Sequence, residues 1–289
     1  MKVEVIIPAY KPDDKLIKAV RALEAQTMKP DRVRIILTKT REGEKDELLA
    51  RLPEGTVVEE IEKKYFSHGG TRQYAVDSSE AAYILFMTQD AIPADRYLVR
   101  NLCGALAKKD AAVAYARQIP YNSSSDIEKY SRRYNYPSYS MSKTKADLPN
   151  MGIKTYFCSD SCAMYNVAIH NELGGFDVTA DFNEDMLYAC KAINCGCSVE
   201  YVSDAHVYHS HDFTLKEQFR RYRHVSRSQR QHREEFRGVK SESEGIKYLM
   251  KGMRYFIYRC NFKAAFGLIA TSAVKYLGFL AGKIGNEQD

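Results

Sequence analysis

The sequence of 289 residues has no tryptophan, no paired CxxC motif and no long apolar leader segment. Its seven cysteines, an odd number in a long chain, fit a reducing compartment better than a disulfide framework. The spacings Cys158/Cys162 and Cys195/Cys197 do not form the paired pattern that binds zinc. Because residues 1–10 carry an apolar run of strand length only, we expect no secretory signal peptide. A hydrophobic fraction of 45% and a charged fraction of 28% indicate a globular protein rather than a disordered one.

Acidic residues are scarce in the last quarter of the chain. Residues 214–289 contain 16 Lys and Arg against 7 Asp and Glu, a balance of +9, so the net charge of +6 leaves −3 for the first 213 residues. This asymmetry indicates an anionic partner for the C-terminal part: a membrane surface, a nucleic acid or a phosphorylated ligand. We expect no nucleic acid, because the chain has no recognisable nucleic-acid recognition module.

Apolar runs of strand length alternate with helical periodicity in the first part of the chain. We expect strands at 3–7, 33–37, 56–61 and 83–87, and helices at 14–25, 42–52 and 71–79, the last after a break at Gly69-Gly70. The run Tyr83–Met87 is continuously apolar, which is typical of a strand buried on both faces of a parallel sheet. The alternation therefore predicts an α/β fold with a mostly parallel central sheet flanked by helices.

Residues 120–150 are polar, rich in Tyr and Ser, and poorly periodic. A long irregular segment inside a compact domain is typical of a lid or binding loop, so we expect this one to close over a ligand. Strand character returns at 156–165 and 199–202, and after residue 213 the chain changes to basic helices. We therefore expect two domains, 1–213 and 214–289.

The last apolar segment, 264–282, is barely long enough to cross a bilayer, which takes ~20 residues. A Lys near the centre of a spanning helix adds roughly 2.5–3.5 kcal/mol. An interfacial amphipathic helix on an anionic membrane surface is therefore favoured over a transmembrane helix. Docking of this helix on its own domain is the alternative.

Acidic and histidine residues stand at the ends of several predicted elements. Asp90 follows the strand at 83–87, Glu184 and Asp185 open a helix, and His209 and His211 follow a late strand. Ligands bind beyond the carboxyl ends of parallel strands, so Asp90 is placed to hold a metal or a phosphate-bearing ligand. Mg²⁺ or Mn²⁺ would accept an Asp90 oxygen and a diphosphate, with one imidazole completing the shell. Asp185 suits a general base within hydrogen-bond reach of a sugar hydroxyl.

Several segments together carry a family resemblance. They are VIIPAYKP (5–12), FSHGGTRQYAV (66–76), FMTQDAIP (86–93), ARQIP (116–120), RRYNYPSYS (132–140), GIKTYFCSDSCAMY (152–165), GGF (174–176) with NEDMLYACKA (183–192), VYHSHDFTLKEQFRRY (207–222) and KYLGFLAGK (275–283). By these segments the sequence resembles the inverting family-2 glycosyltransferases with a GT-A fold and, within them, the rhamnosyltransferase-like group. The match covers nearly the whole chain in the right order. HGGTR together with TQDA and HSH is much more specific than an isolated DxD-like motif.

The resemblance implies a donor site for a nucleoside-diphosphate sugar. Pro8, Ala9 and Tyr10 would flank the nucleotide base. Arg72 would reach the nucleotide-phosphate region of the donor, and Gln89 would stand beside the metal-binding carboxylate.

The resemblance also implies the metal site and the catalytic base. Asp90 would bind Mg²⁺ or Mn²⁺, and His209, or else His211, would complete that site. Asp185 would be the catalytic base, and Glu184 would position the acceptor or the base.

Two departures from the family pattern concern the donor. Thr88 replaces the first carboxylate of the usual DxD, as in the rhamnosyltransferase-like TQD, and favours dTDP-rhamnose. The Asp-rich turn that many relatives carry after the second strand is replaced by residues 37–40, LTKT, which leaves thymidine and uridine donors open.

The expected function is transfer of rhamnose to a polysaccharide or lipid-linked saccharide. We expect this transfer at the cytoplasmic face of a bacterial plasma membrane, with the protein bound peripherally. A UDP-dependent hexosyl- or N-acetylhexosaminyltransferase and a non-catalytic nucleotide-sugar-binding protein are the alternatives.

Overall fold

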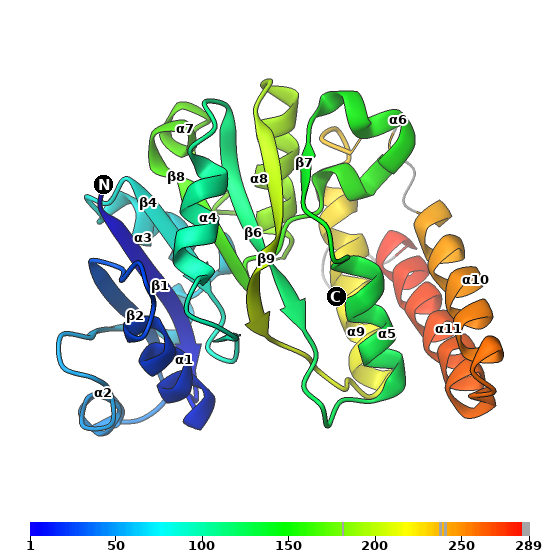
Figure 1. Ribbon diagram of the computed structural model, residues 1–289, viewed down its shortest axis with the longest axis horizontal. Helices are drawn as coiled ribbons and strands as arrows, with labels where there is room; N and C mark the ends of the chain where they lie inside the picture. The colour runs from blue at the N-terminus through cyan, green and yellow to red at the C-terminus, as the bar shows by residue number, and fades with distance from the viewer. Residues whose placement is uncertain (181, 237–238, 240–241, 285–289) are drawn as a thin grey trace. The chain divides into compact units, whose positions relative to one another are not determined.

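The computed structural model describes residues 1–180, 182–236, 239 and 242–284, which form two compact units (Figure 1). The first unit comprises Met1–Ile119, Pro137–Ala146 and Tyr156–His209. The second comprises the described residues of Pro120–Tyr136, Asp147–Thr155 and Ser210–Asp289. The C-terminal segment of the second unit begins at residue 210, and the unit also takes in two earlier segments, whereas the sequence led us to expect a single division after residue 213.

The first unit contains one mixed sheet. Its strands are β1 (Val3–Tyr10), β2 (Arg32–Lys39), β3 (Val57–Glu62), β4 (Tyr83–Met87), β5 (Ile92–Pro93), β6 (Ala111–Ile119), β7 (Met141–Lys143), β8 (Cys162–Asn166) and β9 (Ser198–Tyr208). Its helices are α1 (Asp14–Glu24), α2 (Glu44–Leu49), α3 (His68–Asp77), α4 (Leu98–Leu106), α7 (Val167–Glu172) and α8 (Glu184–Asn194). A turn of 3₁₀ helix occupies Lys63–Tyr65, and two more, Lys145–Asp147 and Gly152–Tyr156, lie where the chain passes between the two units.

The sheet order is β3-β2-β1-β4-β8-β6-β9-β5, with β7 paired to β9. The four strands β3, β2, β1 and β4 are parallel to one another, which confirms the expected parallel part of the sheet. The antiparallel strand β8 lies between β4 and β6, and β6 runs parallel to β9. Because β1 and β4 are parallel neighbours, their carboxyl ends lie at one edge of the sheet, with Tyr10 ending β1 and residues 88–90 following β4.

Alternation along β4 and β8 separates the two faces of the sheet. Leu85 and Met164 point into an aliphatic cluster that includes Leu102 of α4. Phe86 and Tyr165 point to the other face, where both contact the ring of Phe176. The period of two thus explains why β4 is continuously apolar: each face of the sheet is covered.

The helix α3 begins earlier than the sequence predicted. Ser67 is its N-cap and accepts a hydrogen bond from the Gly70 N–H at 3.0 Å, so Gly69-Gly70 lies inside the first turn rather than before the helix. A Cβ at Gly69 would lie 2.1 Å from the Asp177 carbonyl oxygen. The glycine pair is needed for this close approach of two backbones rather than as a break.

The second unit is helical: α5 (Asp126–Asn135), α6 (Leu148–Met151), α9 (Leu215–Gln231), α10 (Glu242–Tyr258) and α11 (Phe262–Ile284). Tyr130 of α5 packs in one apolar cluster with Phe256 of α10 and Leu268 of α11. The expectation that 120–150 is irregular is therefore wrong, because α5 and β7 are regular elements within it. Its closure over a ligand stays a prediction. The segment looked poorly periodic because its buried side chains are tyrosines, whose hydroxyls read as polar.

Candidate active site

Tyr10 at the end of β1 and Gln89 beyond β4 are joined by two hydrogen bonds. The Tyr10 N–H donates to Gln89 Oε1 at 2.9 Å, and Gln89 Nε2 donates to the Tyr10 carbonyl oxygen at 3.1 Å. Ala9 is buried in β1 and Pro8 is half-buried, whereas Tyr10 is exposed. The structure thus brings together four of the residues predicted to hold the donor.

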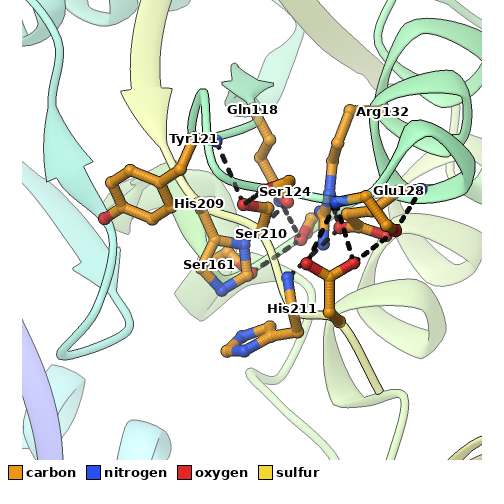
Figure 2. A network of polar contacts seen from close by, with 12 residues as sticks. Gln118, Tyr121, Ser124, Glu128, Arg132, Ser161, His209, Ser210 and His211 are labelled. Atoms are coloured by element: carbon orange, nitrogen blue, oxygen red, sulfur yellow. Dashed lines mark hydrogen bonds and ion pairs between the residues drawn. The ribbon is translucent and has the colours of Figure 1, made fainter. Parts of the chain in front are cut away.

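Asp90 and His209 lie side by side at the same edge of the sheet. His209 Nε2 is 3.5 Å from Asp90 Oδ1, and His209 Nδ1 is 2.8 Å from Gln118 Oε1 (Figure 2). Because an amide oxygen only accepts, this bond assigns the proton of the neutral imidazole to Nδ1 and leaves the Nε2 lone pair toward Asp90. Gln118 is itself held through Nε2, which donates to Ser159 Oγ at 2.9 Å. A carboxylate oxygen beside an imidazole oriented in this way is an arrangement typical of metal ligands.

The other histidine of the HSH motif belongs to the second unit. The His211 N–H donates to Glu128 Oε1 at 3.2 Å (Figure 2). The imidazole ring of His211 stacks on the ring of Phe213 with the centroids 5.0 Å apart. The motif therefore contributes one histidine to each unit. His209 is the one whose ring the first unit holds beside Asp90.

Arg72 of α3 is buried between two carboxylates. Its Nε lies 2.8 Å from Asp160 Oδ2, and its Nη1 lies 2.9 Å from Glu184 Oε1. Nη1 also donates to the His68 carbonyl oxygen at 3.1 Å. Buried charges of this kind are retained when they are paired and hydrogen-bonded. Contact of Arg72 with donor phosphate stays a prediction, since the structure places its guanidinium against Asp160 and Glu184.

Asp185 stands in the first turn of α8, after Asn183, whose backbone is left-handed with a φ of 64°. Asp185 Oδ2 accepts from the Asp160 N–H at 3.1 Å, and Oδ1 accepts from the Met186 N–H at 2.7 Å. Burial and the negative charges of Glu184 and Asp160 raise the pKa of Asp185 to about 8. A carboxylate with so high a pKa is a stronger base than an ordinary aspartate.

Asp160 is a member of this acidic cluster that the sequence analysis did not single out. Its Oδ1 accepts from the Tyr165 hydroxyl at 2.6 Å, its Oδ2 pairs with Arg72, and its N–H holds Asp185. Burial raises the pKa of Asp160 above its usual range, against the opposing effect of Arg72. Asp160 and Gln118 each lie in a segment that carried the family resemblance. That resemblance was the signal that could have pointed to them, because no motif spacing assigned a role to either residue.

The mixed sheet flanked by helices, with these polar residues at its strand ends, is the architecture of the GT-A glycosyltransferase fold. The mannosyltransferase PcManGT of Pyrobaculum calidifontis, solved with GDP-Man and Mn²⁺, aligns with a TM-score of 0.61 at 15% identity, covering 99% of this chain and 76% of that one. S. aureus TarS 1–349, solved with UDP-GlcNAc, aligns with a TM-score of 0.56 at 15% identity, covering 98% of this chain and 90% of that one.

The chain matches the model of glycosyl transferase family 2 over residues 4–174, and it belongs to this family. It is 35% identical over 297 residues to the O-antigen chain rhamnosyltransferase RfbN of Salmonella typhimurium LT2, covering 98% of this chain and 90% of that protein. It is 31% identical over 274 residues to the O-antigen chain rhamnosyltransferase WbaN of Salmonella anatum, covering 91% and 82%. The resemblance to the rhamnosyltransferase-like group is thereby confirmed.

Proposed function

We propose that this glycosyltransferase moves rhamnose, with inversion, from a nucleoside-diphosphate donor to a polysaccharide or lipid-linked saccharide. The observation that carries the choice of sugar is similarity along almost the whole chain to two proteins named as O-antigen chain rhamnosyltransferases. Thr88 in place of the first DxD carboxylate agrees with that choice, and dTDP-rhamnose is the proposed donor.

The donor is tested by thermal shift with dTDP-rhamnose and a panel of UDP- and GDP-sugars, with and without Mn²⁺. A ligand at a hundred times its Kd stabilises the folded state by ~2.7 kcal/mol, so the true donor should raise Tm by several degrees. Tyr10→Ala is the matched variant: its exposed ring is proposed to stack on the base, so every nucleotide-induced shift should shrink. A largest shift with a UDP-hexose or UDP-N-acetylhexosamine would favour the alternative transferase.

The residues beyond β4 fit a divalent cation. Asp90 would supply a carboxylate oxygen and His209 its Nε2, with Gln118 fixing the ring, and the donor diphosphate would supply further oxygens. Bound there, Mg²⁺ or Mn²⁺ supplies positive charge that stabilises the leaving diphosphate. The solved relative that holds Mn²⁺ with GDP-Man supports this proposal for the fold.

In the proposed reaction the acceptor hydroxyl oxygen attacks the anomeric carbon from the face opposite the diphosphate. The new carbon–oxygen bond forms as the bond to the diphosphate oxygen breaks, the diphosphate keeps the electron pair, and the configuration inverts. Asp185 takes the hydroxyl proton. The N–H groups of Asp160 and Met186 each occupy one lone pair of its carboxylate, so they orient it and leave other lone pairs for the proton. Glu184, held by Arg72, is proposed to position the acceptor or the base.

The pH dependence of transfer should follow the protonation of Asp185. With its pKa raised to about 8, Asp185 is mostly protonated below that pH and mostly ready to accept a proton above it, so kcat/KM should rise with pH with a midpoint near pH 8 and level off at higher pH. Asp160→Asn removes a neighbouring negative charge and should move the midpoint of this rise down by roughly one pH unit. Arg72→Lys keeps a positive charge at this position and should leave the pH midpoint close to that of the parent enzyme. An unchanged midpoint in Asp160→Asn would show that Asp160 does not act on the base.

A protein that binds nucleotide sugars without catalysis is the other candidate. The oriented, high-pKa carboxylate of Asp185 argues against it, because binding alone requires no base. Release of free nucleotide from dTDP-rhamnose, with and without a saccharide acceptor, separates the two.

We propose further that the enzyme works at the cytoplasmic face of the plasma membrane, on a lipid-linked acceptor, as a peripheral protein.

A further inference from the structure

Helix α11 turns two glycines toward α9 and leaves most of its large apolar residues exposed, with Leu268 as the buried exception. A Cβ at Gly278 would lie 2.4 Å from the Phe219 carbonyl oxygen of α9, and one at Gly282 would lie 2.4 Å from the Arg223 carbonyl oxygen. The Gly-x-x-x-Gly spacing therefore lets the two helix backbones touch. Docking of this helix on neighbouring helices, which the sequence left as the alternative, is present within the second unit and is made by these glycines and by Leu268.

The outward side of α11 is apolar along its length. Phe262, Phe266, Ile269, Tyr276, Leu277 and Ile284 are between 42% and 79% exposed. Lys263 and Lys283 stand near the two ends of this stripe. A surface helix normally turns such residues to the core, so the exposed stripe indicates a partner that is itself apolar.

Helix α10 adds a second exposed stripe with basic residues beside it. Ile246, Met250 and Ile257 are exposed at helical spacing, and Lys251 and Arg254 are exposed one to four positions away from them. Residues 245–284 contain seven Lys or Arg and no Asp or Glu. The partner of these helices is therefore apolar and negatively charged at once, which describes the interface of an anionic phospholipid bilayer.

We propose that the exposed stripes of α10 and α11 form a membrane face on which the second unit lies in the plane of an anionic bilayer. By length and composition α11 is the one helix in the described residues that is long and apolar enough to cross a membrane. Crossing is disfavoured because its glycine side packs on α9, which carries five arginines, and Arg230 Nη1 donates to the Lys283 carbonyl oxygen at 3.3 Å. Those cations would enter the hydrocarbon with α11, at high cost. Lying flat buries the stripe and leaves the arginines in water.

The inference rests on the proposed function for its purpose, because a lipid-linked saccharide is presented at a bilayer surface. Its physical basis is separate, since it uses only the second unit. The test therefore measures membrane binding without any sugar, and donor binding is measured beside it.

The experiment is co-sedimentation of the full chain with phosphatidylglycerol/phosphatidylcholine vesicles and with pure phosphatidylcholine vesicles. We expect binding to the anionic vesicles that weakens with salt. The triple change Phe266→Ser, Ile269→Ser and Leu277→Ser should weaken binding by at least about tenfold. Lys251→Gln with Arg254→Gln should weaken it by about fivefold per charge, on anionic vesicles alone.

Leu49→Ser with Tyr97→Ser is the matched control, since these exposed side chains belong to the first unit. It should leave vesicle binding unchanged, and all variants should keep the thermal shift with dTDP-rhamnose, which also reports that they are folded. Equal vesicle binding by the Phe266/Ile269/Leu277 variant and the parent chain would overturn the proposal. So would vesicle-independent dimerisation that this variant abolishes, because the stripe would then cover a second copy of the chain. A lost donor shift in the parent chain would instead count against the proposed function.

Discussion

Asp185→Asn is expected to lower kcat for sugar transfer by about 10²–10⁴-fold, the usual contribution of a general base. The amide keeps one oxygen that accepts the Asp160 N–H bond and gives up the bond from the Met186 N–H, so the side chain keeps one of its two anchors while it loses the ability to take a proton. Donor binding should be unchanged or slightly improved, because the substitution removes one of three carboxylates packed together. Nucleotide release with a saccharide acceptor measures the rate, and the thermal shift with donor measures binding.

Glu184→Gln is the matched control for the base. Glu184 is the adjacent carboxylate, but its Oε1 is engaged by Arg72 Nη1 at 2.9 Å, so it should mainly affect acceptor affinity or the position of Asp185. We expect a loss in kcat smaller than that of Asp185→Asn. Near-normal turnover in Asp185→Asn at pH 8, or a larger loss in Glu184→Gln, would move the base to Glu184.

Asp90→Asn and His209→Ala are each expected to weaken Mn²⁺ binding and to lower kcat by roughly 10²–10³-fold. Both remove an atom proposed to bind the cation, and the two atoms lie 3.5 Å apart in the structure. Calorimetric titration of Mn²⁺ in the presence of dTDP reads binding directly, separately from activity. Full activity after exhaustive chelation would remove the metal from the proposal.

Two further variants show how the metal site is assembled. Gln118→Leu removes the acceptor that fixes the His209 ring and should weaken Mn²⁺ binding by about 10–100-fold, whereas Gln118→Glu keeps an oxygen there and should be milder. His211→Ala tests the alternative ligand. A loss in His211→Ala as large as that in His209→Ala would assign both histidines to the cation.

Local patterns were sufficient for the elements that do not depend on distant partners. The expected helix at 14–25 is observed as α1, with the Asp13 side chain accepting from the Lys15 N–H as its N-cap. The strand at 83–87 is found with those bounds because its residues are buried on both faces. The local patterns failed in two places. The helix α5 was missed because the side chain that buries it, Tyr130, carries a polar hydroxyl. The glycine pair of α3 was taken for a break because its close contact with a distant backbone segment leaves no local sequence signal.

The candidate site likewise contains some residues that the sequence predicted and others that it did not. Asp90 was predictable because ligands bind beyond the carboxyl ends of parallel strands, and Tyr10 and Gln89 were predicted through the family resemblance. Asp160 and Gln118 were not, since each acts on a residue 25 or 91 positions away in the chain. The role of Arg72 in pairing carboxylates was likewise invisible, because charge pairs are chosen by the folded arrangement and not by spacing.

The sequence by itself determined the family, the parallel start of the sheet, the carboxylates and histidines available for chemistry, and the basic, apolar C-terminal helices. The tertiary structure decided the properties of these groups: the pKa of Asp185 is raised because folding removes it from water beside two other acids. It also decided that α11 turns Gly278 and Gly282 toward α9 and leaves Phe262 and Phe266 exposed. A pKa and a solvent-facing surface are both set by what surrounds a side chain, and those surroundings exist only once the chain has folded.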